Sequence, residues 1–240
     1  MYNSPEVRFL ACLKLAFIDI DNTLLDFDAY VRETMLLGFE HFGLRKYEPW
    51  MYDRFTEINN GFWHKIESKE ITFKELERDR WNAVFKGLDI DFDGPTFERY
   101  FRAHLNECAI PVEGAYEMLD SLYDKFILAA ASNGPFNQQV NRLKIAGMDK
   151  YFRYYCVSEK YGFSKPSKEF FEKAFEEINA EHPEIKPEET IIIGDSMTSD
   201  IAGGFNYGIN TCYYRRPGAK PADERCDFCV DNLKDIINVI

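Results

Sequence analysis

Four apolar runs along the chain each end in polar residues, and this pattern predicts β-strands. The runs end at Ile18, Ala131, Val157 and Ile193. After residue 110 these runs alternate with helical patterns, which is typical of an α/β fold. We therefore expect a Rossmann-like parallel sheet with helices on both faces. The polar residues that follow such strands lie at one edge of the sheet, where these folds bind their ligands.

Helical signals dominate the segment 27–108, which lacks convincing strand patterns. Thr72 and Glu75 match a capping box at the start of a helix that runs toward Lys86. Pro95 can begin another helix, and its apolar face recurs at helical spacing. The residues of that face are Phe97, Phe101, Leu105 and Cys108.

This change of pattern predicts two domains. We expect residues 1–26 and 109–240 to form the α/β core, and residues 27–108 to form an all-helical domain inserted after the first strand. A helical block inserted directly after a strand that ends in carboxylates is a candidate lid.

Composition limits the classes of partner. The chain has 240 residues, of which 45% are hydrophobic, so it can bury a sizeable core. Its formal net charge of −12 argues against a nucleic-acid polymer or an anionic membrane surface, because both call for clustered Lys and Arg. No apolar stretch reaches the roughly 18 residues of a membrane span. A small phosphorylated molecule remains allowed, because a metal ion and one lysine can neutralise it locally.

The N-terminus and the cysteines predict a cytoplasmic protein. The first residues lack a basic lead, and Lys14 interrupts the apolar run that follows, unlike a signal peptide. Cys226 and Cys229 have a Cys-x-x-Cys spacing, but neither further zinc ligands nor a helix start is evident beside them, so we expect structural use. Four cysteines fall in apparent strands, where a free thiol acts as a small apolar group. These are Cys12, Cys156, Cys212 and Cys229.

Carboxylates follow the first and the last of the four strands. Asp19 and Asp21 lie two residues apart, and two anionic groups this close repel unless a cation lies between them or one is protonated. We interpret the pair as both a metal site and an acid/base pair. Asp195 and Asp200 follow the isoleucine-rich run. Both sets share one sheet edge if their strands are parallel and adjacent.

The second strand ends in groups that can bind an anion. Ser132, Asn133 and Gly134 offer a hydroxyl and free backbone N–H groups where a helix begins near Pro135. Such a helix start attracts negative charge, so the segment predicts an anion site.

The third strand leads to a lysine. Lys165 precedes Pro166, which fits the first position of a helix at 167–179 and would hold the lysine at the mouth of that helix. In chain order, the four strand ends thus supply a carboxylate pair, a hydroxyl with amides, a lysine and a second carboxylate set.

This order resembles the haloacid dehalogenase (HAD) superfamily. The resemblance covers all four signature motifs of that superfamily, and the helical insertion has the position of its first type of cap domain, which closes over the catalytic strand ends. It implies that Asp19 attacks phosphorus and forms an aspartyl-phosphate, while Asp21 protonates the leaving oxygen and later deprotonates water. Asp21 also distinguishes the phosphatases of the superfamily from its carbon–halogen hydrolases, which have no oxygen leaving group to protonate.

The same resemblance implies a bound Mg²⁺, an ion that takes oxygen ligands. Its ligands would be the carboxylates of Asp19 and Asp195 and the main-chain carbonyl of Asp21, with Asp200 one shell further out. The phosphoryl oxygens would be bound by Ser132, the amides of Asn133 and Gly134, and Lys165.

Three segments look more narrowly like the YjjG/YfnB group of pyrimidine nucleotide phosphatases. They are residues 19–28, the Trp63 region with residues 70–72, and residues 194–204. This likeness implies uridine or thymidine monophosphates, ribo or deoxy, as substrates. Trp63 and Phe62, in the stretch 59–63, are then candidates for contact with the base.

Other readings remain open from the sequence. A sugar-phosphate phosphatase or a phosphomutase would carry the same core motifs. A phosphate-accepting receiver module also combines strand-end aspartates, a hydroxyl and a lysine, but it has no reason to carry a large helical insertion. Release of free phosphate from a panel of nucleotides and sugar phosphates would separate these readings.

Overall fold

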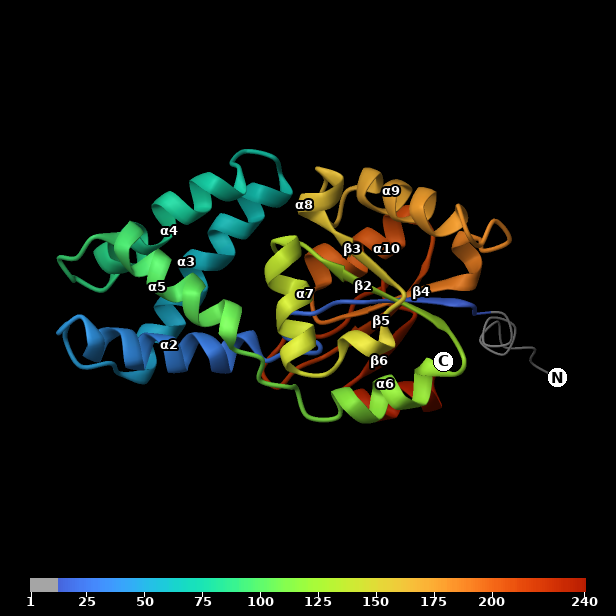
Figure 1. Ribbon diagram of the computed structural model, residues 1–240, viewed down its shortest axis with the longest axis horizontal. Coiled ribbons are helices and arrows are strands. Elements are labelled where there is room, and N and C mark those ends of the chain that lie inside the picture. Colours follow the sequence, from blue (N-terminus) through green and yellow to red (C-terminus); the bar gives the residue numbers. More distant parts are fainter. Residues whose placement is uncertain (1–12) are drawn as a thin grey trace. The chain divides into compact units, whose positions relative to one another are not determined.

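The computed structural model describes residues 13–240, which contain a six-stranded parallel sheet (Figure 1). The strand order is β3-β2-β1-β4-β5-β6, with helices packed against the sheet. The predicted fold class is confirmed. The strands are β1 (Leu15–Ile18), β2 (Ile127–Ser132), β3 (Tyr154–Val157), β4 (Thr190–Gly194), β5 (Asn210–Tyr214) and β6 (Phe228–Val230).

Strand β1 lies at the centre of the sheet and defines its switch point. Phe17 stands opposite Ala129 of β2 and Ile192 of β4, and every β1 residue is buried. The strand is apolar throughout because both of its faces are covered. The chain adds β2 and β3 on one side of β1 and then crosses to add β4 on the other. Ligands of open α/β sheets bind at such a reversal, beyond the carboxyl ends of the strands.

The helices of this unit lie on both faces of the sheet (Figure 1). On one face, the Phe17 ring meets the rings of Phe171 and Phe175 edge-on, at centroid distances of 6.0 and 5.9 Å. Both partners belong to α9, so this helix is fixed against the central strand by aromatic packing. The helices are α6 (Ala115–Tyr123), α7 (Phe136–Ile145), α8 (Ser158–Tyr161), α9 (Lys168–Asn179) and α10 (Ala202–Tyr207).

The chain divides into two compact units. One comprises Met1–Asp26 with Pro111–Ile240, and the other comprises Phe27–Ile110. The second unit consists of α2 (Phe27–His41), α3 (Pro49–Glu67), α4 (Phe73–Gly87) and α5 (Gly94–Glu107). The helical domain predicted at 27–108 overlaps this unit, and its role as a cap stays a prediction.

Local signals begin the helices of the second unit. The Thr72 hydroxyl accepts a hydrogen bond from the Glu75 amide at 3.3 Å, and the Glu75 carboxylate accepts one from the Thr72 amide at 2.8 Å. The predicted capping box is therefore present at the start of α4. Asp93 caps α5 by accepting a hydrogen bond from the Thr96 amide at 2.8 Å. The helix begins at Gly94, one residue before the start expected from Pro95.

A buried ion pair lies in the core of the helical unit. Arg80 contacts Glu98 at 2.6 Å and donates a further hydrogen bond to the Asn59 side chain at 3.1 Å. Burial raises the pKa of Glu98, and the Arg80 charge opposes that effect. Asn59 is only 6% exposed. It is therefore committed to the core of this unit, unlike its neighbours Phe62 and Trp63, which are partly exposed.

Two details differ from the sequence predictions. Helix α9 begins at Lys168 with Ser167 as its N-cap, so Pro166 precedes the cap instead of occupying the first helical position. The Ser167 hydroxyl can cap the helix, whereas proline cannot. Cys229 lies in β6 as expected but is exposed, because β6 is an edge strand; Cys156 and Cys212 are buried in strands. The expectation for Cys12 lies outside the described residues.

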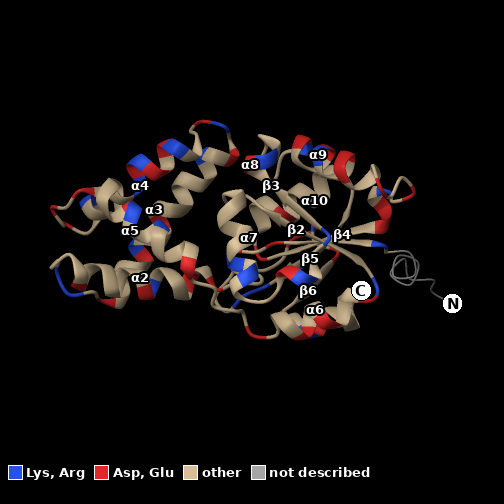
Figure 2. Ribbon diagram, in the orientation of Figure 1, with Lys and Arg blue, Asp and Glu red and all other residues tan. Residues whose placement is uncertain are grey.

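Charges of both signs are interspersed along the helices of each unit (Figure 2). Asp and Glu number 41 and Lys and Arg 29, which gives the acidic balance. Within residues 13–240, no helix combines the length and the apolar character needed to cross a membrane.

Candidate active site

Asp19 stands directly beyond β1 and is fixed on both sides. Its amide donates to the Ile193 carbonyl of β4 at 2.9 Å, which continues the sheet past the last strand residue. One carboxylate oxygen accepts from the Thr23 hydroxyl at 3.2 Å, and the other accepts from Lys165 Nζ at 2.8 Å. The residue is 8% exposed. The carboxylate therefore has a defined orientation at the switch point.

A tight turn follows Asp21 and redirects the chain. Asn22 has φ of 65°, a left-handed conformation that asparagine tolerates better than most residues. The amides of Leu24 and Leu25 both donate to the Ile20 carbonyl at 2.9 Å. The turn therefore redirects the chain directly after the two predicted aspartates, before the helical unit begins at Phe27.

Lys165 is the buried cation of the site. Its Nζ donates to Asp19 at 2.8 Å, to Asp200 at 2.6 Å and to the Ala131 carbonyl at 2.6 Å, so all three of its protons are used. Burial alone would lower the pKa of Lys165, but the Asp19 and Asp200 carboxylates outweigh it and hold the pKa above its ordinary value. The lysine is therefore a permanent positive charge between two carboxylates.

Asn133 fixes the backbone of that lysine. Its side-chain amide donates to the Lys165 carbonyl at 2.9 Å and its side-chain oxygen accepts from the Lys165 amide at 2.8 Å. This two-way contact joins the end of β2 to the loop after α8. The prediction assigned only the Asn133 backbone amide to the phosphoryl group, so its side chain has a function that the sequence did not indicate.

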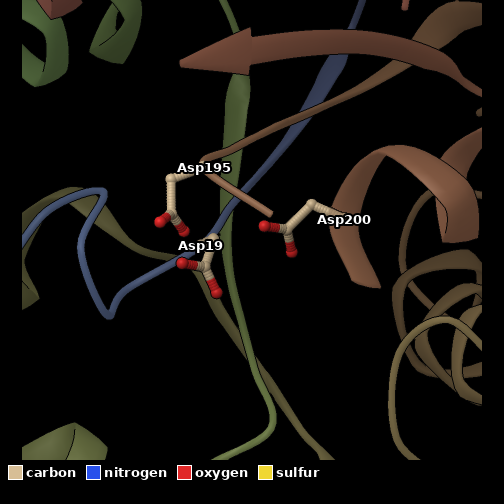
Figure 3. Close-up of side chains that lie close together, drawn as sticks. All are labelled: Asp19, Asp195 and Asp200. Atoms are coloured by element: carbon tan, nitrogen blue, oxygen red, sulfur yellow. The ribbon is translucent and has the colours of Figure 1, made fainter. Parts of the chain in front are cut away.

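Three carboxylates converge beyond the ends of β1 and β4 (Figure 3). One oxygen each from Asp19, Asp195 and Asp200 lies within 4.8 Å of the others. Asp200 is 1% exposed and accepts from the Ser196 amide at 3.0 Å as well as from Lys165. It belongs to a π-helical turn, η3 (Met197–Ile201), a backbone form often found at functional sites.

The cluster fits a hard divalent cation. Burial raises the pKa of Asp19 well above its ordinary value, the Asp200 and Asp195 carboxylates raise it further, and Lys165 opposes them. A further cation among the three carboxylates would offset their mutual repulsion. Its donors are carboxylate oxygens, which Mg²⁺ prefers. Both oxygens of Asp19 and both of Asp200 already accept hydrogen bonds, so the assignment of direct ligands stays a prediction.

Glycine at the end of β4 is required by this cluster. A Cβ on Gly194 would lie 2.2 Å from the Asp200 carboxylate, closer than any real contact. The absence of a side chain at this position lets Asp200 lie against the strand end.

Arg216, just past β5, is part of the site and was not predicted. Its Nε lies 2.8 Å from the Asp195 carboxylate in an ion pair. In the sequence it stands in an ordinary run of two arginines before a proline, with nothing to distinguish it from Arg215. Arg215 instead pairs with Asp231 at 2.6 Å. Only the order of the strands brings Arg216 to Asp195.

Ser132 ends β2 with its hydroxyl held in place. The Ser132 Oγ accepts from the Gly134 amide at 3.0 Å and from the Gln139 side chain at 2.7 Å. The residue is 1% exposed. Helix α7 begins two residues after Gly134, close to the predicted start.

Gln139 and Arg142 of α7 contact the second aspartate and were not predicted either. Gln139 donates to one Asp21 oxygen at 2.6 Å, and Arg142 donates to the other at 2.5 Å. Both lie on the buried face of α7, where hydropathy alone would place apolar residues. Their spacing of three residues, which shares one helix face, was the available signal.

Trp63 lies in the helical unit, on α3. It is partly exposed, and its ring centroid lies 6.0 Å from that of Phe73. Its expected contact with a base stays a prediction.

Comparison with known proteins identifies the family of the chain. A family model of haloacid dehalogenase-like hydrolases matches residues 13–208. The chain belongs to this family. This HAD hydrolase is 35% identical over 203 residues to the HAD hydrolase YfnB of Bacillus subtilis, covering 85% of the chain and 84% of the relative. It is 34% identical over 204 residues to the pyrimidine 5'-nucleotidase PynA of Streptococcus pneumoniae, covering 84% and 83%. The predicted superfamily and YjjG/YfnB group are confirmed.

Solved structures agree on the fold of this HAD hydrolase. Magnesium-bound YfnB of Bacillus subtilis superposes with a TM-score of 0.84 at 31% identity, covering 95% of this chain and 98% of that one. An L-2-haloacid dehalogenase of Xanthobacter autotrophicus has a TM-score of 0.72 at 15% identity, covering 95% and 98%. At that identity the likeness concerns the fold alone.

Proposed function

We propose that this HAD hydrolase is a Mg²⁺-dependent phosphatase that acts on pyrimidine nucleoside 5'-monophosphates through an aspartyl-phosphate on Asp19. The observation that carries the proposal is the convergence of Asp19, Asp195 and Asp200, with Lys165 paired to Asp19 and Asp200. A dianionic phosphate monoester can approach such an acidic cluster only if a cation offsets its charge. The nucleotide preference is supported by the similarity to PynA.

The metal would be held by the Asp19 and Asp195 carboxylates and the Asp21 main-chain carbonyl, with Asp200 contacting it through water. Bound there, Mg²⁺ would offset phosphate charge and hold the phosphorus in line with its nucleophile.

The first chemical step transfers the phosphoryl group to Asp19. A carboxylate oxygen of Asp19 forms a bond to phosphorus as the ester P–O bond breaks. Ser132 and the Asn133 amide would bind the phosphoryl oxygens. Lys165 and the Gly134 amide, whose protons are engaged in this structure, would each exchange a present hydrogen bond for one to the phosphoryl group. The proton that the leaving oxygen needs comes from the Asp21 carboxyl group.

The second step returns the enzyme to its starting state. Asp21, now a carboxylate, takes a proton from water as the water oxygen attacks phosphorus. The bond between phosphorus and Asp19 breaks, which releases inorganic phosphate and the Asp19 carboxylate.

A carbon–halogen hydrolase is the competing activity within the fold, and Asp21 argues against it. Such an enzyme has no leaving oxygen to protonate, so a buried helix face would have no reason to hold a second carboxylate there. A sugar-phosphate phosphatase or a phosphomutase would share every core residue named above. The acidic balance of the chain and its interspersed charges (Figure 2) favour a small substrate over a nucleic-acid polymer.

The deciding experiment measures phosphate release from nucleoside monophosphates, sugar phosphates and p-nitrophenyl phosphate with Mg²⁺, and halide release from a 2-haloacid. We expect phosphate release, fastest with uridine or thymidine monophosphate. Halide release without phosphate release would refute the proposal, and isomerised sugar phosphate would indicate a mutase. The cytoplasmic location expected from the sequence stays a prediction.

A further inference from the structure

The Gln139 amide links two groups of the site that the chain places far apart. Its Nε2 donates to Ser132 Oγ at 2.7 Å and to Asp21 Oδ2 at 2.6 Å. Its oxygen accepts from Arg142 at 2.9 Å. Both amide protons and the amide oxygen of Gln139 are therefore engaged in hydrogen bonds. The residue as a whole is 1% exposed. A buried network in which every member is satisfied is rigid and orients its members.

This arrangement sets the direction of the Ser132 proton. The hydroxyl oxygen already accepts two hydrogen bonds, from Gly134 and Gln139. A hydroxyl with both lone pairs used can only donate in the remaining direction. Gln139 thereby keeps Ser132 as a donor, which is the role that phosphoryl binding requires.

Arg142 holds the other side of Asp21. The Arg142 side chain is 2% exposed, and its guanidinium donates a hydrogen bond to Asp21 Oδ1 at 2.5 Å. Gln139 donates to the other oxygen, Oδ2. Burial of a guanidinium carries a large desolvation penalty unless the group is paired. Packing of α7 alone therefore does not explain why this buried face is polar. Apolar residues at both positions would seal the same helix against the sheet.

We propose that Gln139 and Arg142 are positioning residues of the active site, which fix the orientation of the Asp21 carboxyl group and of the Ser132 hydroxyl. The inference rests on the proposed phosphatase function, in which Asp21 supplies the leaving-group proton. Both residues act through Asp21 and Ser132 and transfer no proton themselves.

The test compares leaving groups. The value of kcat/KM reports steps up to departure of the leaving group, so later hydrolysis of the aspartyl-phosphate does not enter. Arg142→Met should lower kcat/KM for a nucleoside monophosphate about 10- to 100-fold, since small misplacements of a reacting group cost this much. For p-nitrophenyl phosphate the loss should be under about threefold, because its phenolate departs without a proton. Arg142→Lys should restore most of the nucleotide activity.

Gln139→Met is the second variant and removes the hydrogen bonds to both Asp21 and Ser132. It should show the same dependence on the leaving group, with an added rise in KM for both substrates because Ser132 loses its fixed direction. Thermal denaturation and circular dichroism establish that each variant is folded. If Arg142→Met does not fold, Gln139→Met and Arg142→Lys still decide the question.

A double-mutant cycle separates positioning from packing. Asp21→Asn combined with Arg142→Met should be no slower on the nucleotide than Asp21→Asn alone, because Arg142 acts through Asp21. Lys144→Met is the matched control, since it removes an exposed cation from the same helix and should leave kinetics unchanged.

The outcomes distinguish the inference from the function on which it rests. Equal losses on both substrates, or additive losses in the cycle, would show that Gln139 and Arg142 only pack α7. If Asp21→Asn itself shows no dependence on the leaving group, or the wild-type protein releases no phosphate, the proposed function fails instead.

Discussion

Asp19 has a fixed orientation and is the proposed nucleophile. Asp19→Asn keeps the shape of the side chain, including its contact with Thr23, but removes the carboxylate that would attack phosphorus. We expect phosphate release to fall below about 1% of the wild-type rate, because covalent catalysis has no substitute group at this position. A colorimetric phosphate assay measures the loss, and an unchanged circular dichroism spectrum shows that the fold is intact. Higher residual activity would indicate direct attack of water on the substrate.

At the scale of residues, the sequence predicted the groups that follow strands and missed those that approach from elsewhere. Asp19, Ser132, Lys165 and Asp200 form one connected set in the structure, since Lys165 reaches both aspartates and the β2 carbonyl next to Ser132. A strand that ends in a polar residue is a local pattern, and a local pattern can be recognised in a single sequence.

Gln139, Arg142 and Arg216 carry no such signal. Polar side chains on a helix normally indicate a face that contacts solvent. A buried polar face such as that of α7 is therefore predicted, wrongly, to be exposed. Arg216 depends on β5 lying next to β4, which no short segment encodes.

Among the elements, the end of β4 is the most constrained by its neighbours. In Gly194→Ala the new Cβ would meet the Asp200 carboxylate at 2.2 Å, so Asp200 must move and take its contact with Lys165 along. We expect at least about a tenfold loss of kcat/KM from the displaced cluster. Overpacking should also lower the free energy of unfolding by about 1–3 kcal/mol.

A urea titration and the phosphate assay test both effects of Gly194→Ala. Gly61→Ala is the control for the urea titration, because nothing lies within 4 Å of its Cβ position on α3 and alanine should not lower the free energy of unfolding there. Wild-type activity in Gly194→Ala would mean that Asp200 need not lie against the strand.

The capping box of α4 gives a second prediction for an element. Thr72→Ala removes the hydroxyl that accepts from the Glu75 amide, and this should lower the free energy of unfolding by about 1 kcal/mol. Urea denaturation measures it. Lys74→Ala, at an exposed position in the first turn of the same helix, should change it by less than about 0.5 kcal/mol. Equal effects of the two substitutions would contradict the capping role.

The sequence predicted that these helices exist. Where each helix begins depended on which residue serves as its N-cap. The capping box at Thr72 was visible because both members lie within one turn. The start of α9 was not, because Pro166 and Ser167 are adjacent and either could begin a helix by its own chemistry. The structure uses Ser167, whose hydroxyl accepts from the Phe170 amide at 3.4 Å.

For the whole molecule, metal binding should be visible as stability. A ligand that binds only the folded state stabilises it, by about 2.7 kcal/mol at a concentration 100 times its Kd. We expect Mg²⁺ to raise the Tm of the wild-type protein and EDTA to stop phosphate release. Asp195→Asn should abolish the Mg²⁺-dependent rise in Tm, whereas Asp91→Asn, an exposed carboxylate of the helical unit, should keep it. A rise that persists in Asp195→Asn would place the ion elsewhere.

In the proposed function the core motifs bind a phosphoryl group and a metal, and neither distinguishes one leaving group from another. Discrimination among substrates must therefore come from residues outside them, and the inserted helical unit is the largest such part of the molecule. Within the stretch 59–63, the Asn59 side chain is bonded to the buried Arg80, which leaves the partly exposed Phe62 and Trp63 as the aromatic candidates.

Stacking of an aromatic side chain on a base contributes about 1–3 kcal/mol in single-stranded nucleic-acid sites. If Trp63 stacks on the pyrimidine, Trp63→Ala should raise KM for uridine or thymidine monophosphate by roughly 10- to 100-fold, the equivalent of that energy. Hydrolysis of p-nitrophenyl phosphate, which has no base, should be nearly unchanged. Phe62→Ala tests the neighbouring ring in the same assay.

Trp50→Ala is the matched control, because Trp50 is an exposed tryptophan on the same helix, with its indole bonded to Glu48 at 3.1 Å. It should leave both substrates unaffected. An equal loss on both substrates in Trp63→Ala would show that this ring only packs against Phe73 within the helical unit. Base recognition would then have to come from other residues, because a packing defect acts on every substrate alike, whereas a lost stacking partner acts only on those that carry a base.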